Sequence, residues 1–292
     1  MIWDGHIHID HIQTKEEPRA VKLNENGIEG GTLISLCPNS FNHMPGKNNL
    51  TTQERLDNLF KWVECNKSLY PFYWIDPTEE DSLEQVREAF DRGVAGYKII
   101  CDHFYPYDER AVQVYEAVAE LGKPILFHSG ILWDGSFSSI YNRPAGFEVL
   151  LGIKGLKFAL AHISWPWCDE CIAVYGKFQH AREGRFGVTC EMFIDITPGT
   201  PEIYRKDALT KLIRTGYKVE NNIIFGTDNY IDDYNVKDVA KVVNNDNLIY
   251  NDLGVSHEIR DRFFCRNLRR FLGIDDIAGQ SGKLLWGYYE GL

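Results

Sequence analysis

The 292-residue sequence lacks several features that define large classes of proteins. It has no apolar run of about 18 residues, so no segment is predicted to cross a membrane as a helix. It has no long block of like charges, and its formal net charge is -11. That balance argues against nucleic acid or an anionic membrane surface as the main partner. We therefore expect a small-molecule substrate, and the sequence is compatible with a homo-oligomer.

The short motifs of several common enzyme mechanisms are also missing. There is no G-x-S-x-G nucleophile elbow, no G-x-x-x-x-G-K-S/T phosphate loop and no G-x-G-x-x-G dinucleotide-binding motif. We therefore expect no organic cofactor. The first residues contain no basic segment followed by an apolar stretch, so we also expect no export signal.

Cysteine is neither abundant nor arranged as a disulfide framework. The seven cysteines are odd in number and lie mostly inside apolar runs, which is typical of reduced, buried thiols. Cys168 and Cys171 have the two-residue gap of a zinc or redox pair, but no second such pair exists. We interpret them as ordinary thiols and expect a cytoplasmic protein.

What the sequence does contain is a regular alternation of short apolar runs with longer, helix-like segments. Apolar runs of strand length, rich in β-branched and aromatic residues, predict buried strands. The predicted strands cover residues 2–9, 31–37, 71–75, 96–101, 124–128, 157–163, 187–194 and 223–227. Most of the gaps between them are long enough for a crossover helix, which is the pattern of parallel βα units.

Three of these gaps carry clear helix signals. Thr51 and Glu54 form a capping box that would begin the first helix. A second helix is expected after Thr78, and a third should have Thr200 as its N-cap and Pro201 at its first position. The residues expected to face the core are Leu56, Leu59, Phe60 and Val63 in the first helix, Leu83, Val86 and Phe90 in the second, and Tyr204, Leu209, Leu212 and Ile213 in the third.

Eight strand–helix units predict an α/β fold, a (β/α)8 TIM barrel of about 250 residues. The remainder, from about residue 256 to 292, would form a C-terminal helical extension. An open doubly wound sheet is the rival fold, but a closed barrel alone brings all strand ends around one rim. We therefore predict a single domain over residues 1–292.

Histidine and aspartate stand at the ends of these predicted strands. His6 and His8 are two residues apart on the first strand, so their side chains project to the same face. His128, His162 and Asp228 end the fifth, sixth and eighth strands. An isolated His-x-His is more often a pair of core residues than a metal site, but convergence at one rim predicts a divalent metal ion. Zinc is favoured, with manganese or iron as alternatives.

The arrangement of these residues resembles the amidohydrolase superfamily, in particular the single-domain "amidohydrolase 2" type of TIM-barrel hydrolases and decarboxylases. Its pattern has His-x-His on strand one, Lys or Glu on strand four in some branches, His on strands five and six, and Asp on strand eight. The residues that match in order are His6, His8, Lys98, His128, His162 and Asp228. Residues 267–273 also look like the helix that closes many such barrels. The resemblance covers essentially the whole chain.

The number of metal ions depends on Lys98. As the resemblance to two-metal members implies, a carboxylated Lys98 could bridge two ions. An uncarboxylated Lys98 could instead bind a substrate carboxylate, or face away from the barrel. Burial near a metal would lower the pKa of this lysine and supply the neutral amine that carboxylation needs. The sequence leaves one ion or two open.

The chemistry implied is hydrolysis of an amide, ester or lactone by a water molecule whose pKa the metal lowers toward about 7. Asp228 would orient this water and carry its proton, and His162 would bind a second ion or donate to the developing oxyanion. Two alternatives remain. One is a metal-dependent lyase that decarboxylates or hydrates a small carboxylic acid. The other is a barrel that binds a metal or ligand without turnover.

Residues in the loops after the strands are expected to line the substrate pocket. Arg143 could hold a substrate carboxylate with two hydrogen bonds, although a loop arginine is more often a solvated surface residue. Glu191, within the seventh predicted strand, could point inward or face a helix. The aromatic candidates for substrate binding are Tyr105, Trp133 and Trp165, and further wall candidates are His103, Tyr107, Trp167, Asn229 and Tyr230.

Overall fold

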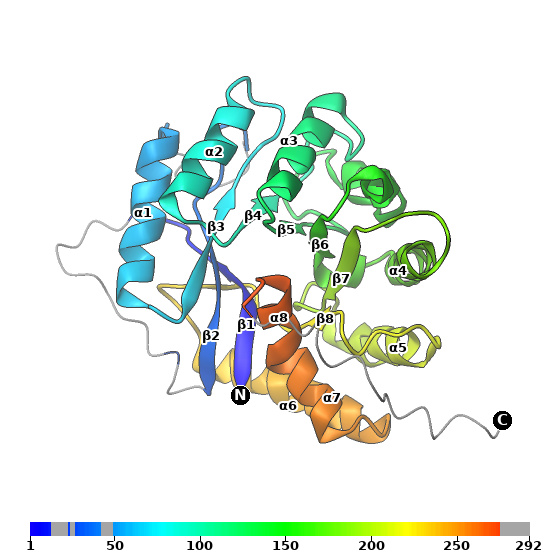
Figure 1. The fold of residues 1–292 in the computed structure, drawn as a ribbon. Coiled ribbons are helices and arrows are strands. Elements are labelled where there is room, and N and C mark those ends of the chain that lie inside the picture. Colours follow the sequence, from blue (N-terminus) through cyan, green and yellow to red (C-terminus); the bar gives the residue numbers. More distant parts are fainter. Residues whose placement is uncertain (13–22, 24–26, 42–48, 275–292) are drawn as a thin grey trace.

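The computed structural model describes residues 1–12, 23, 27–41 and 49–274, and its centre is a parallel sheet with helices around it (Figure 1). The strands are β1 (Ile2–His8), β2 (Ile28–Ile34), β3 (Leu69–Trp74), β4 (Gly96–Ile99), β5 (Ile125–Phe127), β6 (Lys157–Leu160), β7 (Glu191–Asp195), β8 (Ile223–Ile224) and β9 (Asn229–Tyr230). Their order in the sheet is β8-β7-β6-β5-β4-β3-β2-β1-β9.

The sheet closes on itself through the segment that contains β8 and β9. β8 pairs with β7, and β9, five residues later, pairs with β1. Between them, Gly5 N donates to Phe225 O at 2.9 Å and Asp228 N donates to His6 O at 2.9 Å. Because both edges belong to one short stretch of chain, the predicted TIM barrel is confirmed.

Two strands differ from their predicted bounds for backbone reasons. The seventh begins at Glu191 rather than at residue 187, since Gly187 has a φ of 70°, outside the extended region. The eighth is divided because Asp228 has a φ of 61°, which interrupts the ladder between β8 and β9. The second strand begins three residues earlier than expected, at Ile28, which pairs with Ile2.

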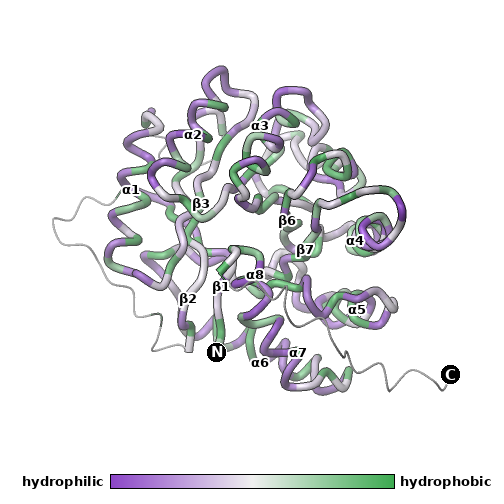
Figure 2. The backbone as a smooth tube through the Cα atoms, viewed as in Figure 1, coloured by the Kyte–Doolittle hydropathy of each residue, from purple (hydrophilic) through white to green (hydrophobic). Residues whose placement is uncertain are grey.

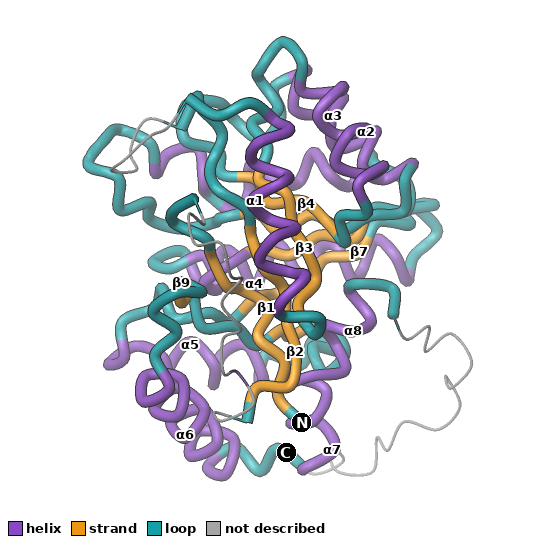
Figure 3. The backbone as a smooth tube through the Cα atoms, turned by 90° about the vertical axis from the view of Figure 1, so that its left-hand side faces the viewer, coloured by secondary structure: helices purple, strands orange, loops and turns teal. Residues whose placement is uncertain are grey.

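The helices surround the barrel, and in Figure 2 they alternate hydrophilic and hydrophobic stretches, as expected for helices with one face on a sheet. Figure 3 shows the strands at the centre of the molecule, with helices outside them. The α-helices are α1 (Thr52–Cys65), α2 (Ser82–Arg92), α3 (Glu109–Glu120), α4 (Cys168–Glu183), α5 (Glu202–Arg214), α6 (Val236–Asp252), α7 (His257–Asp261) and α8 (Asn267–Phe271). Between β5 and β6, the 3-10 segments Ser139–Asn142 and Pro144–Gly152 replace a crossover α-helix.

The first predicted helix is confirmed at its start and on its inner face. The Thr51 hydroxyl accepts from Glu54 N at 3.2 Å, and the Glu54 carboxylate accepts from Thr51 N at 2.8 Å. Leu56 and Leu59 are fully buried. The two remaining predicted core residues, Phe60 and Val63, are half-buried.

The second and third predicted helices are present, but some of their predicted core and capping residues are wrong. Leu83 is exposed because α2 turns Ser82, Gln85, Val86 and Ala89 inward instead. Pro201 is the N-cap of α5, and the Thr200 hydroxyl donates to His162 O rather than capping the helix. Tyr204 is 51% exposed, whereas Leu209 and Leu212 are buried as predicted.

Apolar side chains fill one end of the barrel and leave the other end to polar residues. Phe72, Trp74, Leu126 and Phe193 belong to the inner cluster, and Phe271 of α8 packs on it, with ring centroids 6.4 Å from Phe72 and 5.0 Å from Phe193. Figure 1 shows α8 lying across this end of the ring of strands.

The predicted C-terminal helical extension is present as far as the structure describes it. A π-helical turn, Arg262–Arg266, joins α7 to α8 and makes one continuous helix that ends at Phe271. Residues 275–292 of the predicted extension lie outside the described residues. All seven cysteines are free thiols. Among the described helices, none combines the length and the apolar character that a membrane span requires.

A buried ion pair holds the loop after β7. Arg205 of α5 donates from Nε and Nη2 to the two oxygens of Asp246 in α6, both at 2.6 Å, and from Nη1 to Ile196 O at 2.8 Å. The two side chains are 4% and 0% exposed. Removing one partner of such a pair leaves an uncompensated buried charge.

We expect Asp246→Asn to lower the free energy of unfolding by about 3–5 kcal/mol, measured by urea denaturation. The double variant Arg205→Met/Asp246→Leu, which removes both charges, should recover most of this loss. Asp252→Asn is the control, because it breaks an exposed pair with Lys206 and should change stability by less than about 1 kcal/mol. An Asp246→Asn effect as small as that of the control would contradict the prediction.

Candidate metal centre

Three ligand atoms at the carboxyl ends of the strands form a small triangle. His6 Nε2 lies 3.1 Å from His8 Nε2, and the two nitrogens lie 3.5 and 3.3 Å from Asp228 Oδ1. Zinc bonds to nitrogen and oxygen of about 2.0–2.2 Å place tetrahedral ligands about 3.3–3.6 Å apart. The triangle therefore fits one face of a tetrahedral metal site, and these three residues could hold a metal ion.

The hydrogen-bond partners of two imidazoles decide which nitrogen is free to bind metal. His6 Nδ1 lies 2.7 Å from Asp195 Oδ2, and His128 Nε2 lies 3.2 Å from Ile131 O. Both oxygens act as acceptors, so each of these nitrogens carries the proton. The lone pairs of His6 Nε2 and His128 Nδ1 are therefore available to a cation.

Two further histidines lie beside the triangle. The rings of His6 and His162 are 5.4 Å apart between centroids, and those of His162 and His128 are 5.0 Å apart. His162 Nδ1 and His8 Nδ1 are buried and have no hydrogen-bond partner among the described residues. These two nitrogens are not atoms of the triangle, in which His8 takes part through Nε2.

Lys98 lies inside the same cluster. Its side chain projects from β4 into the barrel, is 1% exposed, and places Nζ 3.3 Å from His6 Nε2. The outward-facing alternative for this lysine is thus wrong. Burial lowers the pKa of Lys98 to about 8, although Asp228 and Asp195 oppose the shift. The lowered pKa makes the neutral amine, which carboxylation needs, easier to reach near neutral pH.

Burial favours the neutral form of three histidines of the site. It lowers the pKa values of His6 and His128 well below the ordinary value, and that of His162 to about 4. Neutral imidazole is the form that binds metal. Asp228 is 37% exposed at its side chain, so it is the most open member of the triangle. All six residues predicted as ligands thus gather at one place, and their role in binding metal remains a prediction.

Strained backbone surrounds these side chains. His162, Ile163, Ser164 and Asp228 have φ values of 63°, 49°, 56° and 61°, in the left-handed region that non-glycine residues rarely adopt. Each such residue costs on the order of 1–3 kcal/mol and persists where the surroundings enforce it. Strain of this kind concentrates at functional sites.

Two buried aspartates of the site were not predicted from the sequence. Asp195 ends β7 and directly follows the predicted seventh strand, as Asp228 follows the predicted eighth, so the same signal could have found it. Asp4 lies within β1 and accepts from His6 N at 3.0 Å, from Thr227 N at 2.9 Å and from the Tyr234 hydroxyl at 2.6 Å. Burial raises the pKa of Asp4 to about 6 although these bonds oppose it.

Arg143, predicted to bind substrate, is held by its own chain. Its guanidinium is paired with the carboxylate of Glu170 and lies over the ring of Trp167, 5.0 Å from the centroid. The side chain is 50% exposed. Glu191 lies on the same face of β7 as Phe193 and Asp195, so it points inward, at the end of the barrel that α8 covers, where it bonds to Asn222 and Arg270.

The aromatic candidates occupy several loops. Tyr105 stacks on Tyr107 with centroids 5.0 Å apart, and Trp165 packs on Tyr204 at 5.1 Å. Trp133 is 83% exposed. These contacts leave substrate binding by Tyr105, Trp133 and Trp165 as a prediction. Nearer the triangle are the rings of Tyr230 and Trp74, 6.2 and 5.9 Å from the His8 ring.

His103, also among the wall candidates, bridges the loops after β3 and β4. Its Nδ1 lies 2.6 Å from Asp102 Oδ1, and its Nε2 lies 3.0 Å from Thr78 Oγ1 and 3.6 Å from Asp76 Oδ2. The bond to Asp102 raises the pKa of His103, and Asp76 adds to this while partial burial and Arg110 oppose it. Asp76 and Asp102 are buried, whereas His103 is partly open to solvent.

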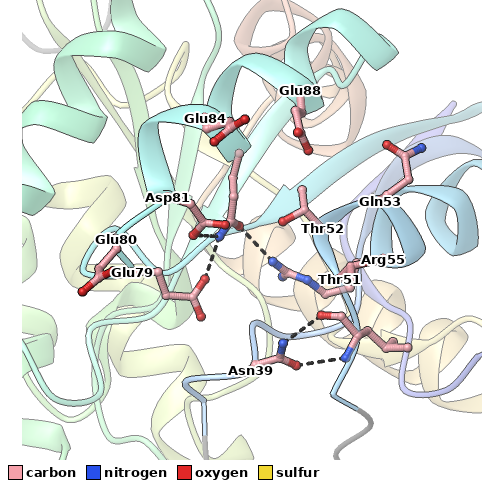
Figure 4. A pocket seen from close by; sticks show the side chains of 12 residues that line it. Asn39, Thr51, Thr52, Gln53, Arg55, Glu79, Glu80, Asp81, Glu84 and Glu88 are labelled. Carbon is pink, nitrogen blue, oxygen red and sulfur yellow. Dashed lines mark hydrogen bonds between the residues drawn. The ribbon is translucent and has the colours of Figure 1, made fainter.

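A pocket of about 550 Å³ lies apart from the predicted ligands, between the segment before α1 and the start of α2 (Figure 4). Five carboxylates line it, together with buried Arg55, which donates to Gln85 and to Trp74 O. The carboxylates belong to Glu79, Glu80, Asp81, Glu84 and Glu88. None of the six predicted metal ligands lines this pocket.

Comparison with known proteins identifies a family and several similar folds. A family model described as "Amidohydrolase" matches residues 51–274. An uncharacterized TIM-barrel protein from Bordetella bronchiseptica has a TM-score of 0.64 at 13% identity, covering 93% of this chain and 98% of that one. A 2,6-dihydroxybenzoate decarboxylase from Rhizobium has a TM-score of 0.58 at 14% identity, covering 94% and 98%. A dihydroorotase from Campylobacter jejuni has a TM-score of 0.54 at 15% sequence identity, covering 94% of this chain and 84% of that one. No curated protein sequence matches the chain.

We expect Gly199→Ala to weaken metal binding at least tenfold, measured as zinc retained per chain under a competing chelator. A Cβ at residue 199 would lie 2.7 Å from Cβ and Cγ of His162, so the ring would have to move. Gly152→Ala is the control, because nothing lies within 4 Å of its added carbon. Equal zinc retention in the two variants would contradict the proposed place of His162.

The raised pKa of His103 predicts a pH-dependent stability. The folded state binds the His103 imidazole proton more tightly than the unfolded state does. Protonated His103 therefore stabilises the fold below about pH 6.5, and this stabilisation is lost as pH rises through the folded-state pKa. The stability advantage of the wild-type chain over His103→Gln should therefore shrink between pH 6 and pH 9, measured by urea denaturation. A difference that stays constant across this range would contradict the assignment.

Proposed function

The chain belongs to the amidohydrolase family, and we propose that it is a metal-dependent hydrolase that cleaves an amide, ester or lactone bond of a small molecule. The observation that carries the proposal is the position of Lys98. A buried lysine whose Nζ lies 3.3 Å from His6 Nε2, among four histidines and Asp228, is placed to become a carbamate ligand. A site of that kind would hold two ions.

The residues divide into two ligand groups in this proposal. His6, His8 and Asp228 would hold one ion, and His128 and His162 would hold the second, with carboxylated Lys98 as a ligand available to both. The metal would be a divalent ion, with zinc favoured and manganese or iron as alternatives. When bound, it would lower the pKa of a water molecule, so that hydroxide is available at neutral pH.

Asp228 has the position of the general base. Its carboxylate is part of the triangle, yet its side chain is 37% exposed, so it can meet both a water molecule and a substrate. It would take a proton from the water during attack on the carbonyl and pass it to the leaving group. Should the site hold one ion, His162 would instead donate a hydrogen bond to the developing oxyanion.

Hydrolysis is favoured over the lyase alternative by the cations available. In a decarboxylase or hydratase the metal would bind substrate oxygens, and a protein cation would help to hold the substrate carboxylate, but Arg143, the arginine expected there, is paired with Glu170. A carbamate of Lys98 would also remove that charge from substrate binding. The rings of Trp74 and Tyr230 near His8 fit a substrate with an apolar part, and Tyr105, Trp133 and Trp165 are proposed to extend this wall.

Elemental analysis of the purified chain tests the metal count. We expect about two ions per wild-type chain and one or none in Lys98→Met, because the shared ligand is lost. Lys61→Met, which changes an exposed lysine of α1, should retain the wild-type content. A ¹³C resonance of a carbamate in ¹³CO₂-equilibrated protein should vanish in Lys98→Met. About one ion in both chains and no carbamate signal would contradict the two-ion proposal and place the lyase on an equal footing.

Asp228→Asn tests the proposed base. With a panel of amides, esters and lactones, turnover should fall by about 10²–10⁴-fold while the fold and much of the metal are kept. Asp10→Asn, an exposed carboxylate two residues beyond His8, is the matched control. Wild-type turnover in Asp228→Asn would contradict the role of this carboxylate.

A further inference from the structure

Asp195 is a buried carboxylate that touches the metal triangle only through His6. It ends β7, its side chain is 1% exposed, and its Oδ2 lies 2.7 Å from His6 Nδ1. Its other oxygen accepts from Thr197 N at 2.7 Å and from the Thr197 hydroxyl. Each oxygen of Asp195 therefore has its own set of donors.

The donors on Thr197 are fixed in place. Thr197 is fully buried, and its hydroxyl lies against Gly226, where an added Cβ would be 2.4 Å from Oγ1. The residue before it, Ile196, donates its N–H to Ile224 O at 2.9 Å, and its carbonyl accepts from Arg205. The group at position 195 must therefore present an acceptor to Thr197, whatever it presents to His6.

We propose that Asp195 is a positioning residue that fixes the tautomer of His6 and thereby sets the metal affinity of the site. The carboxylate accepts the Nδ1 proton of His6, which leaves the Nε2 lone pair facing His8 Nε2 and Asp228 Oδ1. This inference rests on the metal centre of the proposed function. It concerns a residue on β7, a strand that supplies none of the predicted ligands.

The two fixed donors on Thr197 make the amide variant more damaging than truncation. In Asp195→Asn, the amide oxygen must face Thr197, so the NH₂ group faces His6 Nδ1. That nitrogen must then accept, the proton moves to Nε2, and Nε2 can no longer bind a cation. In Asp195→Ala, His6 loses its acceptor but stays free to adopt either tautomer. A packing role would give the opposite order, because Asn keeps the shape of Asp and Ala leaves a cavity.

The first experiment measures zinc affinity of the full chain by competition with a chromogenic chelator. We expect Asp195→Ala to lose about tenfold and Asp195→Asn about a hundredfold or more, the range found for partners of metal-binding histidines. Asp252→Asn, which changes an exposed carboxylate of α6, should match the wild-type chain. Equal affinity of Asp195→Asn and the wild-type chain, or a greater loss in Asp195→Ala than in Asp195→Asn, would overturn the proposal.

The second experiment observes the tautomer directly, by ¹⁵N NMR of the histidine rings in metal-free protein. His6 should carry its proton on Nδ1 in the wild-type chain and on Nε2 in Asp195→Asn. This measurement stands if Asp195→Ala fails to fold. It also separates the two proposals: a wild-type chain that binds no zinc but shows this tautomer exchange would refute the proposed function and keep the role of Asp195 in orienting His6. An Nδ1 proton in both chains would overturn the inference.

Discussion

The site depends on the hydrogen bond between His6 and Asp195, which determines the nitrogen that His6 presents to the other predicted ligands. His6 Nδ1 donates its proton to Asp195, so His6 Nε2 presents a lone pair to His8 Nε2 at 3.1 Å and to Asp228 Oδ1 at 3.5 Å. Burial keeps the His6 imidazole neutral. A divalent ion could bind all three atoms, and the strained backbone and burial around them are typical of a functional site.

Closure of the barrel brings those atoms together. Asp4 accepts from the backbone of His6 and of Thr227, so one buried carboxylate joins the first strand to the residue just before Asp228. The bond from Asp228 N to His6 O adds a second link. At the opposite end of the barrel, Phe271 of α8 packs against the apolar side chains inside it. The polar end can therefore hold buried imidazoles while the opposite end supplies stability.

The parts that could be predicted from the sequence depend on local patterns. A polar residue directly after a buried apolar run marks a strand end, and in a parallel barrel all strand ends share one rim, so His6, His8, Lys98, His128, His162 and Asp228 could be grouped without a structure. The same pattern marks Asp195, which directly follows the apolar run of β7 but was not predicted.

Features that depend on tertiary contacts could not be predicted in this way. Asp4 and Tyr234 are 230 residues apart in sequence, and no local signal connects them. Leu83 and Tyr204 were placed inward by helical periodicity, but packing set the rotation of α2 and α5 and left both exposed. The pairing of Arg143 with Glu170 likewise joins a residue between two 3-10 segments to the first turn of α4, a contact that no local pattern predicts.

The most direct test of the metal centre is X-ray diffraction from crystals grown with zinc, recorded on both sides of the zinc absorption edge. The account predicts an anomalous peak bonded at about 2.0–2.2 Å to His6 Nε2, His8 Nε2 and Asp228, with a second beside His128 and His162. Crystals that hold zinc elsewhere, for example at the exposed group of Asp10, His11 and Asp232, but show no peak at the triangle would contradict it.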